Sequence, residues 1–514
     1  MNNKKIVAGL LALTFVLGGA ALPNKVVSNN AVILASAEEE TEVLTFGDFE
    51  YTLLEDGTVE IARYIGSDTE VEIPGEINGA AVTSIGERAF YAMSRFNNED
   101  YVVIDYYEKL SYETESEKYK NIKNITSVVI PGSVTEIKES AFEGCISLES
   151  ITLPQKLKYI GKSAFFDCEN IKSIVIPDSV KEIGFWAFSY CLSLESITLP
   201  KDLKCIDEHV FAGCETLKNI VIPDGVEKIE LAAFADCCNI ESIVIPDSVK
   251  TIGRYAFYDC DSIESLVIPD SVEIIENGAF EHCSNLRDVT LPKGLKKIDA
   301  FVFAHCDSLK GITFPEGVEE IGERAFVYSL GLENFVIPDS VKTIGEFAFS
   351  NCHNLKSITI PASVTDIGDW AFVNSESRVI YSMSMYKPSK DLVINCCKDS
   401  AAHKYALKNG NNFNVIDAED SKTKYPKLIN EEYNAKYRQF RLNWTAVEGA
   451  EEYGIAVKLA GKWKVQAYTD ADTTTYTSPK LTSGQSYQAV ICAKVNGKWD
   501  TSVLNNRAFP LVVR

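Results

Sequence analysis

The chain has 514 residues, of which 46% are hydrophobic, and its formal net charge is −23. This length exceeds one ordinary hydrophobic core, so several domains or a long repeat array are expected. The hydrophobic fraction excludes a largely disordered chain, and the acidic balance argues against binding to nucleic acid or to an anionic membrane.

The first 37 residues have the features of an export signal. MNNKK is followed by the apolar run IVAGLLALTFVLGGAAL, and no acidic residue occurs before Glu38. The run is too short for a comfortable membrane span, and Ala35, Ser36 and Ala37 resemble a small-residue cleavage site. We therefore expect residues 1–37 to be a signal peptide and the protein to be secreted. No membrane span is expected elsewhere.

Residues 38–124 are predicted to form an N-terminal cap and a first, irregular copy of a unit that later recurs regularly. Pro131 follows Pro74 by 57 residues, whereas the later prolines are 23 apart. Most of the extra residues lie between Tyr91 and Thr126. Insertions in solenoids often lie on the binding face, so the tyrosines of this insert are candidate ligand contacts; the alternative is a loop that only covers the first turns. The five candidates are Tyr101, Tyr106, Tyr107, Tyr112 and Tyr119.

Residues 125–375 follow a period of 23. Phenylalanines and cysteines keep step with the prolines, which is typical of a solenoid whose units stack. The segment before each proline, such as IESIVIP, alternates apolar and small polar residues and predicts a short strand. The proline should end that strand, and the rest of the unit should return as an extended piece and a short helical turn. The prolines are Pro131, Pro154, Pro177, Pro200, Pro223, Pro246, Pro269, Pro292, Pro315, Pro338 and Pro361.

The pattern LxxIxIPxxVxxIxxxAFxxC resembles the BspA-like leucine-rich repeats of bacterial surface and secreted proteins. This resemblance implies an α/β-type leucine-rich repeat solenoid with short parallel strands. It also implies frequent roles in adhesion or ligand binding, without implying one ligand.

Nine of the 14 cysteines share one phase of the repeat, and Ser329 and Ser375 replace the cysteine in two units. A position that accepts cysteine or serine suits a small, buried side chain. Disulfides between neighbouring turns, a metal site or a catalytic thiol are the alternatives. The phased cysteines are Cys145, Cys168, Cys191, Cys214, Cys237, Cys260, Cys283, Cys306 and Cys352.

Two further positions of the unit carry candidate residues. The residue nine after the proline is often aromatic, and we expect these rings to pack over the rim of the core or to form an exposed stripe for sugars or proteins. Aspartate often follows the proline directly, which turn chemistry explains; an acidic stripe for cations is the alternative. The aromatic candidates are Trp186, Tyr255, Phe301, Phe347 and Trp370.

Residues 376–416 are predicted to cap the solenoid. Ser400 is a suitable helix N-cap, AAHKYALKN a short helix, and Gly410 its end. A charged linker at 417–428 follows. Residues 429–514 contain short strands separated by glycine turns, which predicts an all-β sandwich. This part resembles a fibronectin type III domain, because Trp444, Tyr453 and Tyr487 match the family's core positions.

These features together predict an exported binding or adhesion protein that contacts protein or carbohydrate at or near the bacterial cell surface. A secreted matrix scaffold without a discrete ligand is the alternative. No catalytic motif, cofactor or metal site is predicted, since motifs such as HExxH, GxSxG or a Walker loop do not occur in the sequence.

Overall fold

The computed structural model describes residues 42–92, 121–375 except 316, 386–416, and 425–513 except 427, 435, 445–446, 448, 460, 483–484 and 502–503. The predicted signal peptide and the tyrosine-rich insert lie outside these residues. In the part of the chain that is described, no helix has the length and hydrophobicity needed to cross a membrane.

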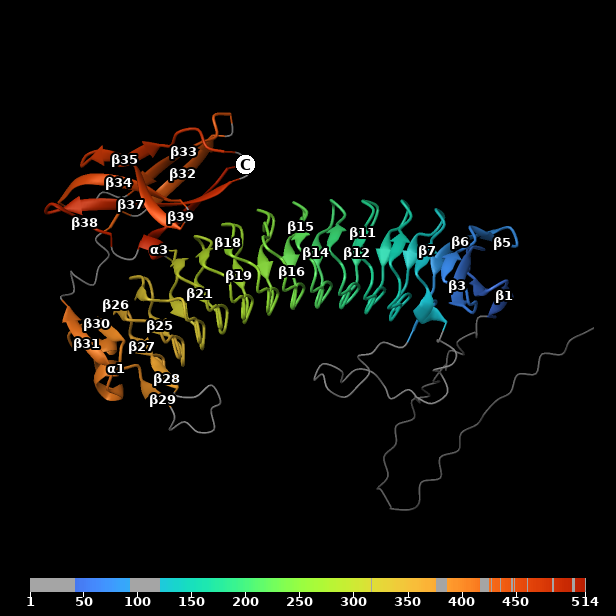
Figure 1. Ribbon diagram of the computed structural model, residues 1–514, viewed down its shortest axis with the longest axis horizontal. Helices are drawn as coiled ribbons and strands as arrows, with labels where there is room; N and C mark the ends of the chain where they lie inside the picture. Colours follow the sequence, from blue (N-terminus) through green and yellow to red (C-terminus); the bar gives the residue numbers. More distant parts are fainter. Residues whose placement is uncertain are drawn as a thin grey trace, which may run out of the picture. The chain divides into compact units, whose positions relative to one another are not determined.

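The repeats form two ladders of short parallel strands (Figure 1). The first ladder consists of the strands before the prolines: β4 (Glu70–Glu72), β7 (Ser127–Val129), β9 (Ser150–Thr152), β11 (Ser173–Val175), β13 (Ser196–Thr198), β15 (Asn219–Ile220), β18 (Ser265–Val267), β20 (Asp288–Thr290), β22 (Gly311–Thr313), β24 (Asn334–Val336) and β26 (Ser357–Ile360). The second ladder begins at the cap strand β3 (Val59–Tyr64) and continues through β6 (Ala80–Ile85), β8 (Glu136–Ile137), β10 (Tyr159–Ile160), β12 (Glu182–Ile183), β14 (Cys205–Ile206), β16 (Lys228–Ile229), β17 (Thr251–Ile252), β19 (Ile274–Ile275), β21 (Lys297–Ile298), β23 (Glu320–Ile321), β25 (Thr343–Ile344) and β27 (Asp366–Ile367).

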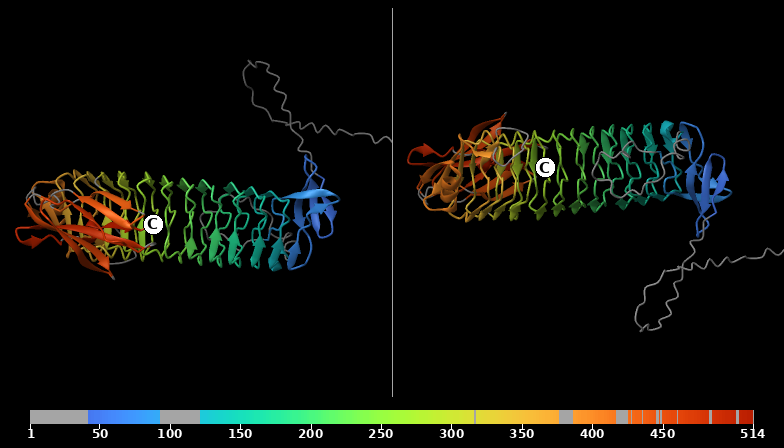
Figure 2. Two further views of the ribbon diagram at one scale, coloured as in Figure 1. Left: turned by 90° about the horizontal axis from the view of Figure 1, so that it is seen from above. Right: turned by 90° about the horizontal axis from the view of Figure 1, so that it is seen from below.

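Consecutive units stack side by side with a register of 23 residues, as in the pairing of Ser173 with Ser196 (Figure 2). In strands of the first ladder such as β9, β11 and β13 the middle residue is buried and its neighbours point outward, as the alternation in sequence predicts. The predicted solenoid of short parallel strands is confirmed. Each ladder is divided into several hydrogen-bonded blocks rather than one continuous sheet.

The helical turn predicted after the second strand is wrong, and with it the α/β-type label for the repeats. Within the described part of 125–375 the segment contains turns and no helix. In every unit from Pro131 to Pro361 the residue nine after the proline has φ between 50° and 64°. A second left-handed residue follows four positions later in the units from Pro131 to Pro338. Two left-handed residues within one turn are incompatible with a right-handed α-helix.

The repeated phenylalanines form one continuous stack through the core. From Phe90 to Phe372 the ring centroids of neighbouring units are 4.9 to 5.9 Å apart, with planes inclined by 1° to 18°. Tyr64 stacks on Phe90 at one end, and Tyr405 meets Phe372 edge-on at the other. Each ring is therefore buried between two others, which explains why phenylalanine recurs at the same position of every unit.

The phased cysteines are buried free thiols that tie one unit to the one before it. Each Sγ donates to the carbonyl oxygen of the phenylalanine in the preceding unit, at 3.0 to 3.3 Å. Ser329 makes the same bond to Phe303 at 2.7 Å. The position thus needs a small side chain with one donor, and this requirement explains the exchange of cysteine and serine.

We expect thiol counting on the unfolded, non-reduced protein to find nearly all 14 cysteines reactive, because all of them are free in the structure. A matched count after reduction should give the same number. Four or fewer reactive thiols before reduction would contradict the structural assignment.

The solenoid begins with β1 (Leu44–Phe46) and β2 (Phe49–Leu53), which pair antiparallel with each other, and β2 pairs antiparallel with β3. The extra residues between Pro74 and Phe90 form a hairpin of β5 (Glu76–Ile77) and β6. Its turn consists of Asn78 and Gly79, both with positive φ, as expected for an Asn-Gly turn. A short 3₁₀ helix, η1 (Ile122–Asn124), precedes the first regular unit.

The C-terminal cap has the predicted helix. Ser400 accepts a hydrogen bond from the backbone of His403 and starts α1 (Ala401–Asn409), and Gly410 ends it with a φ of 73°. The other elements of the cap are β28 (Val373–Ser375), β29 (Tyr386–Pro388), β30 (Val393–Cys397) and β31 (Asn412–Ile416). Because β30 and β31 extend the first ladder in parallel, they cover its last strand.

The C-terminal part is formed by two antiparallel sheets. One sheet contains β32 (Leu428–Asn434), β33 (Gln439–Trp444) and β36 (Thr475–Thr477). The other contains β34 (Ala450–Leu459), β35 (Lys462–Asp470), β37 (Ser486–Val495), β38 (Lys498–Trp499) and β39 (Phe509–Val512). Trp444 and Tyr453 are buried in a shared core, with ring centroids 5.6 Å apart. A one-turn helix, α3 (Leu504–Arg507), departs from the predicted all-β content.

Candidate functional site

The five tyrosines predicted as contacts in the insert lie outside the described residues, and they stay a prediction. The aromatic candidates nine residues after the prolines are described. They lie on what we call the turn face, formed by the side chains eight, nine, twelve and thirteen residues after each proline.

The aromatic residues of the turn face are packed against neighbouring units. Tyr255 lies over Gly278, where any side chain would collide with its ring. Arg324 lies between the rings of Phe301 and Phe347, 5.5 and 4.8 Å from their centroids. Phe347 is only 2% exposed, whereas Trp186, Tyr255, Phe301 and Trp370 are half-buried. These rings therefore do not form one continuous exposed stripe.

Further aromatic residues surround Trp186 and were not singled out by the sequence pattern. Trp186 meets Phe166 at 6.1 Å and His209 at 5.6 Å between ring centroids. Phe185 is 39% exposed, and the ammonium of Lys162 lies 4.9 Å from its ring centroid. Phe185 and Trp186 are adjacent in the sequence, whereas the other repeats have at most one aromatic residue at these two positions. This difference was the sequence signal that could have identified the cluster.

A short column of stacked rings lies thirteen residues after the prolines. His282 and His305 are parallel, with ring centroids 4.2 Å apart, and Tyr328 stacks on His305 at 4.7 Å. Burial and the neighbouring His282 lower the pKa of His305 to about 4. The thiols beside this column are not nucleophiles, since burial raises the pKa of Cys283 and Cys306 well above its ordinary value.

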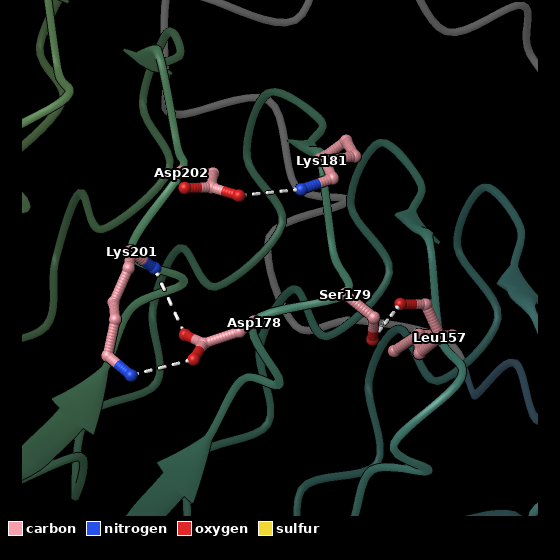
Figure 3. Close-up of polar contacts among 6 residues, drawn as sticks. All are labelled: Leu157, Asp178, Ser179, Lys181, Lys201 and Asp202. Carbon is pink, nitrogen blue, oxygen red and sulfur yellow. Dashed lines mark hydrogen bonds and ion pairs between the residues drawn. The ribbon is translucent and has the colours of Figure 1, made fainter.

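Two of the aspartates that follow the prolines, Asp178 and Asp270, link neighbouring units. Asp178 accepts hydrogen bonds from the backbone N–H of Lys201 at 3.2 Å and from its Nζ at 2.9 Å (Figure 3). The bond from Lys201 lowers the pKa of Asp178. Asp270 and Lys293 make the same pair of bonds one block later. The aspartate thus fixes the start of the next unit, in addition to its role in the turn.

In some units the serine after this aspartate points to the unit before it. Ser179 donates to the carbonyl oxygen of Leu157 at 2.6 Å (Figure 3). Ser248 donates to that of Val226 at 2.6 Å, whereas the buried hydroxyls of Ser271 and Ser340 have no hydrogen-bond partner in the described part of the chain. Among the residues that the structure describes, no group of three or more His, Cys, Asp and Glu side chains is arranged to hold a metal ion. Asp178 and Ser179 thus join their unit to the units on both sides, which gives this Asp-Ser pair a structural role.

The most exposed apolar side chains of the repeats lie on a different surface. We define the strand face as the outward side chains two and four residues before the prolines, from Ser127 to Val244. Val221 is 82% exposed and Val244 is 78% exposed. Val129 and Val175 are also exposed. Thr152 and Thr198 occupy the same position in the units that alternate with those of Val129, Val175 and Val221. A line of exposed β-branched residues is a surface that a partner can cover.

Small polar residues and alternating charges flank this line. Ser150, Ser173 and Ser196 are exposed four residues before their prolines. The exposed side chains one position earlier alternate in sign; they are Glu149, Lys172, Glu195, Lys218 and Glu241. The strand face contains no aromatic side chain. It is therefore suited to a broad, shallow contact of nearly balanced charge rather than to a small-molecule pocket.

Comparison with known protein families gives one match. The model described as "BspA type Leucine rich repeat region" matches residues 113–241, 229–340 and 319–387. These ranges overlap and together cover more than half of the chain. No curated protein sequence matches it.

Several solved structures are similar to the chain. A leucine-rich repeat protein from Bacteroides ovatus is 25% identical, with a TM-score of 0.48, and covers 73% of this chain and 100% of its own. A leucine rich cell surface protein from Faecalibacterium prausnitzii is 28% identical, with a TM-score of 0.38, and covers 66% and 97%. The pneumococcal vaccine antigen PcpA is 21% identical, with a TM-score of 0.49, and covers 73% and 99%.

Proposed function

Because the chain belongs to the BspA type leucine-rich repeat family, we propose that it is an exported binding or adhesion protein that makes protein or carbohydrate contacts at or near the bacterial cell surface. The basic start, apolar run and small-residue cleavage site of residues 1–37 support export. No catalytic role is proposed, because the phased thiols are buried and protonated: burial raises the pKa of Cys214 to about 12.

The observation that carries this proposal is the exposure of the valine line on the strand face. Inside the repeats the phased phenylalanines and cysteines are occupied by contacts between units. The valines two residues before the prolines are exposed instead, at 82% for Val221. A protein surface is the favoured partner for this face, because carbohydrate sites usually stack sugars on aromatic rings, and the aromatic rings lie on the turn face.

We propose that the C-terminal sheets form a fibronectin type III-like sandwich that serves as a spacer or presentation module. The burial of Trp444 against Tyr453 between the two sheets supports this assignment. The direct contact of this part with a ligand is the alternative.

A binding screen tests the proposed function against a secreted scaffold without a discrete ligand. The immobilised full-length protein should be presented with extracellular-matrix proteins, bacterial surface proteins and purified polysaccharides at physiological salt. We expect saturable binding to at least one protein. Absence of saturable binding to every component would favour the scaffold, and binding to polysaccharides alone would move the contact to the turn face.

A further inference from the structure

The first ladder is broken between β9 and β11, between β15 and β18, and between β22 and β24. The break between β15 and β18 contains a unit that lacks a strand, although its sequence predicts a strand like the others. Residues 242–244, before Pro246, are not in a strand, although ESIVIP differs little from the KSIVIP that ends at Pro177. The blocks on either side end at β15 and begin at β18. The predicted strand is therefore wrong in this unit, and the unit separates two hydrogen-bonded blocks of the strand face.

The backbone contacts agree with this interruption. In some paired units the residue before the proline donates to the next unit, as from Ile176 to Thr198 at 3.0 Å and from Ile268 to Thr290 at 3.0 Å. The unit of Pro246 differs from the paired units in its whole segment: among the described residues, none of residues 241–245 makes a backbone hydrogen bond to the unit on either side.

The remainder of the same unit is fully joined to its neighbours. In the second ladder, β17 pairs with β16 and with β19. On the turn side, the N–H of Phe234 donates to Ala256 at 2.8 Å, and that of Phe257 donates to Ala279 at 2.9 Å. The ring of Phe257 stacks on Phe234 at 5.3 Å and on Phe280 at 5.4 Å. Only one side of the unit is open.

We infer that the unit of Pro246 is a hinge of the solenoid, about which the strand face opens and closes. An open ladder on one side and intact contacts on the others allow bending in one direction only, because the continuous stack and the second ladder keep the units together. Local openings of this kind have small free energies when few backbone hydrogen bonds must break. Val221 lies at the edge of the opening and Val244 lies within it, and both valines are exposed.

This position gives the hinge a role in binding. A partner that lies across both valines would contact the block that ends at β15 and the open unit at once, and it would fix the distance between them. A change in curvature would in turn alter the spacing of the valine line that the partner contacts. The inference concerns the protein by itself and holds whether or not the partner proposed above is found.

Hydrogen exchange on the full-length protein tests the open ladder. Amides of residues 241–245 should exchange at least tenfold faster than those of β13, which is equally exposed and paired on both sides. Residues 251–257 of the same unit should remain protected, which serves as an internal control. Equal protection of residues 241–245 and β13 would overturn the inference.

Spin labels test the bending itself. A pair at Thr198→Cys and Val244→Cys spans the opening, and a pair at Val175→Cys and Val221→Cys spans two paired units at the same repeat position. The half-buried thiols Cys205 and Cys238 should be replaced by serine in both proteins. The dipolar couplings should show a broader distance distribution for the first pair. Equal widths would overturn the hinge even if exchange is fast.

Discussion

Replacing Phe257 by alanine should lower the free energy of unfolding by about 3–5 kcal/mol. The ring of Phe257 is fully buried and lies between the rings of Phe234 and Phe280. The backbone carbonyl oxygen of Phe257 accepts a hydrogen bond from the thiol of Cys283. The cavity would remove contacts from both neighbouring units. Urea unfolding followed by circular dichroism measures the change, and hydrogen exchange should show that the loss of protection spreads to the adjoining units.

Phe185→Ala is the matched control, because this phenylalanine belongs to the same repeat array and is 39% exposed. Its effect should be within about 1 kcal/mol. Similar shifts for Phe257→Ala and Phe185→Ala would show that the stack is not the main source of stability, and the constant phenylalanine phase would then have another cause.

The protein should be more stable at pH 5 than at pH 8. Burial raises the pKa of Glu143 from 4.5 to about 7. The folded state therefore holds this proton more tightly than the unfolded state does, so the contribution is complete below about pH 4.5 and is lost as the pH rises through about 7. The loss at Glu143 amounts to about 2–3 kcal/mol.

A second carboxyl acts in the same direction. Burial, together with the charges of Asp259 and Glu215, raises the pKa of Asp236 to about 6. This side chain is only half-buried, so solvent screens its effect and its contribution is smaller than that of Glu143.

Urea unfolding at both pH values measures this dependence, and Glu143→Gln isolates the contribution of Glu143. The glutamine is neutral throughout, so the variant should show a smaller difference between pH 5 and pH 8 and should exceed the wild type in stability at pH 8. Other carboxyls whose pKa burial raises, Asp236, Glu281 and Glu431, and the net charge of −23 add a dependence on pH that remains in the variant. An unchanged difference in the variant would show that Glu143 does not contribute to the pH dependence.

The residues that could be predicted from the sequence are those that face the core or a helix end. The phases of phenylalanine, cysteine and proline, the N-cap at Ser400 and the helix stop at Gly410 are set by local chemistry, and all are confirmed. Each of these positions requires a certain side-chain size, one hydrogen-bond donor or a single backbone conformation. A single residue type can meet such a requirement, so the requirement is visible in the sequence.

The failures have a different origin. The left-handed residues nine after the prolines include Trp186, Arg324 and Phe347. These residue types rarely adopt a positive φ, so the absence of the predicted helical turn could not be foreseen from the sequence. The interruption at 242–244 has no counterpart in the local residues, because ESIVIP differs little from KSIVIP, which forms a strand. Whether an aromatic ring is exposed depends on the next unit, as when Gly278 leaves room for Tyr255.

Two double variants test directly whether the strand face is the binding surface, on whichever partner the screen yields. Val221→Asp with Val244→Asp places two charges on the strand face at exposed positions, where the fold should tolerate them. Phe185→Ala with Trp186→Ala changes the turn face instead. The first variant should weaken binding at least tenfold, about 1.4 kcal/mol, and the second should bind like the wild type. Wild-type affinity in the folded valine variant, with loss in the aromatic variant, would contradict a binding role for the strand face.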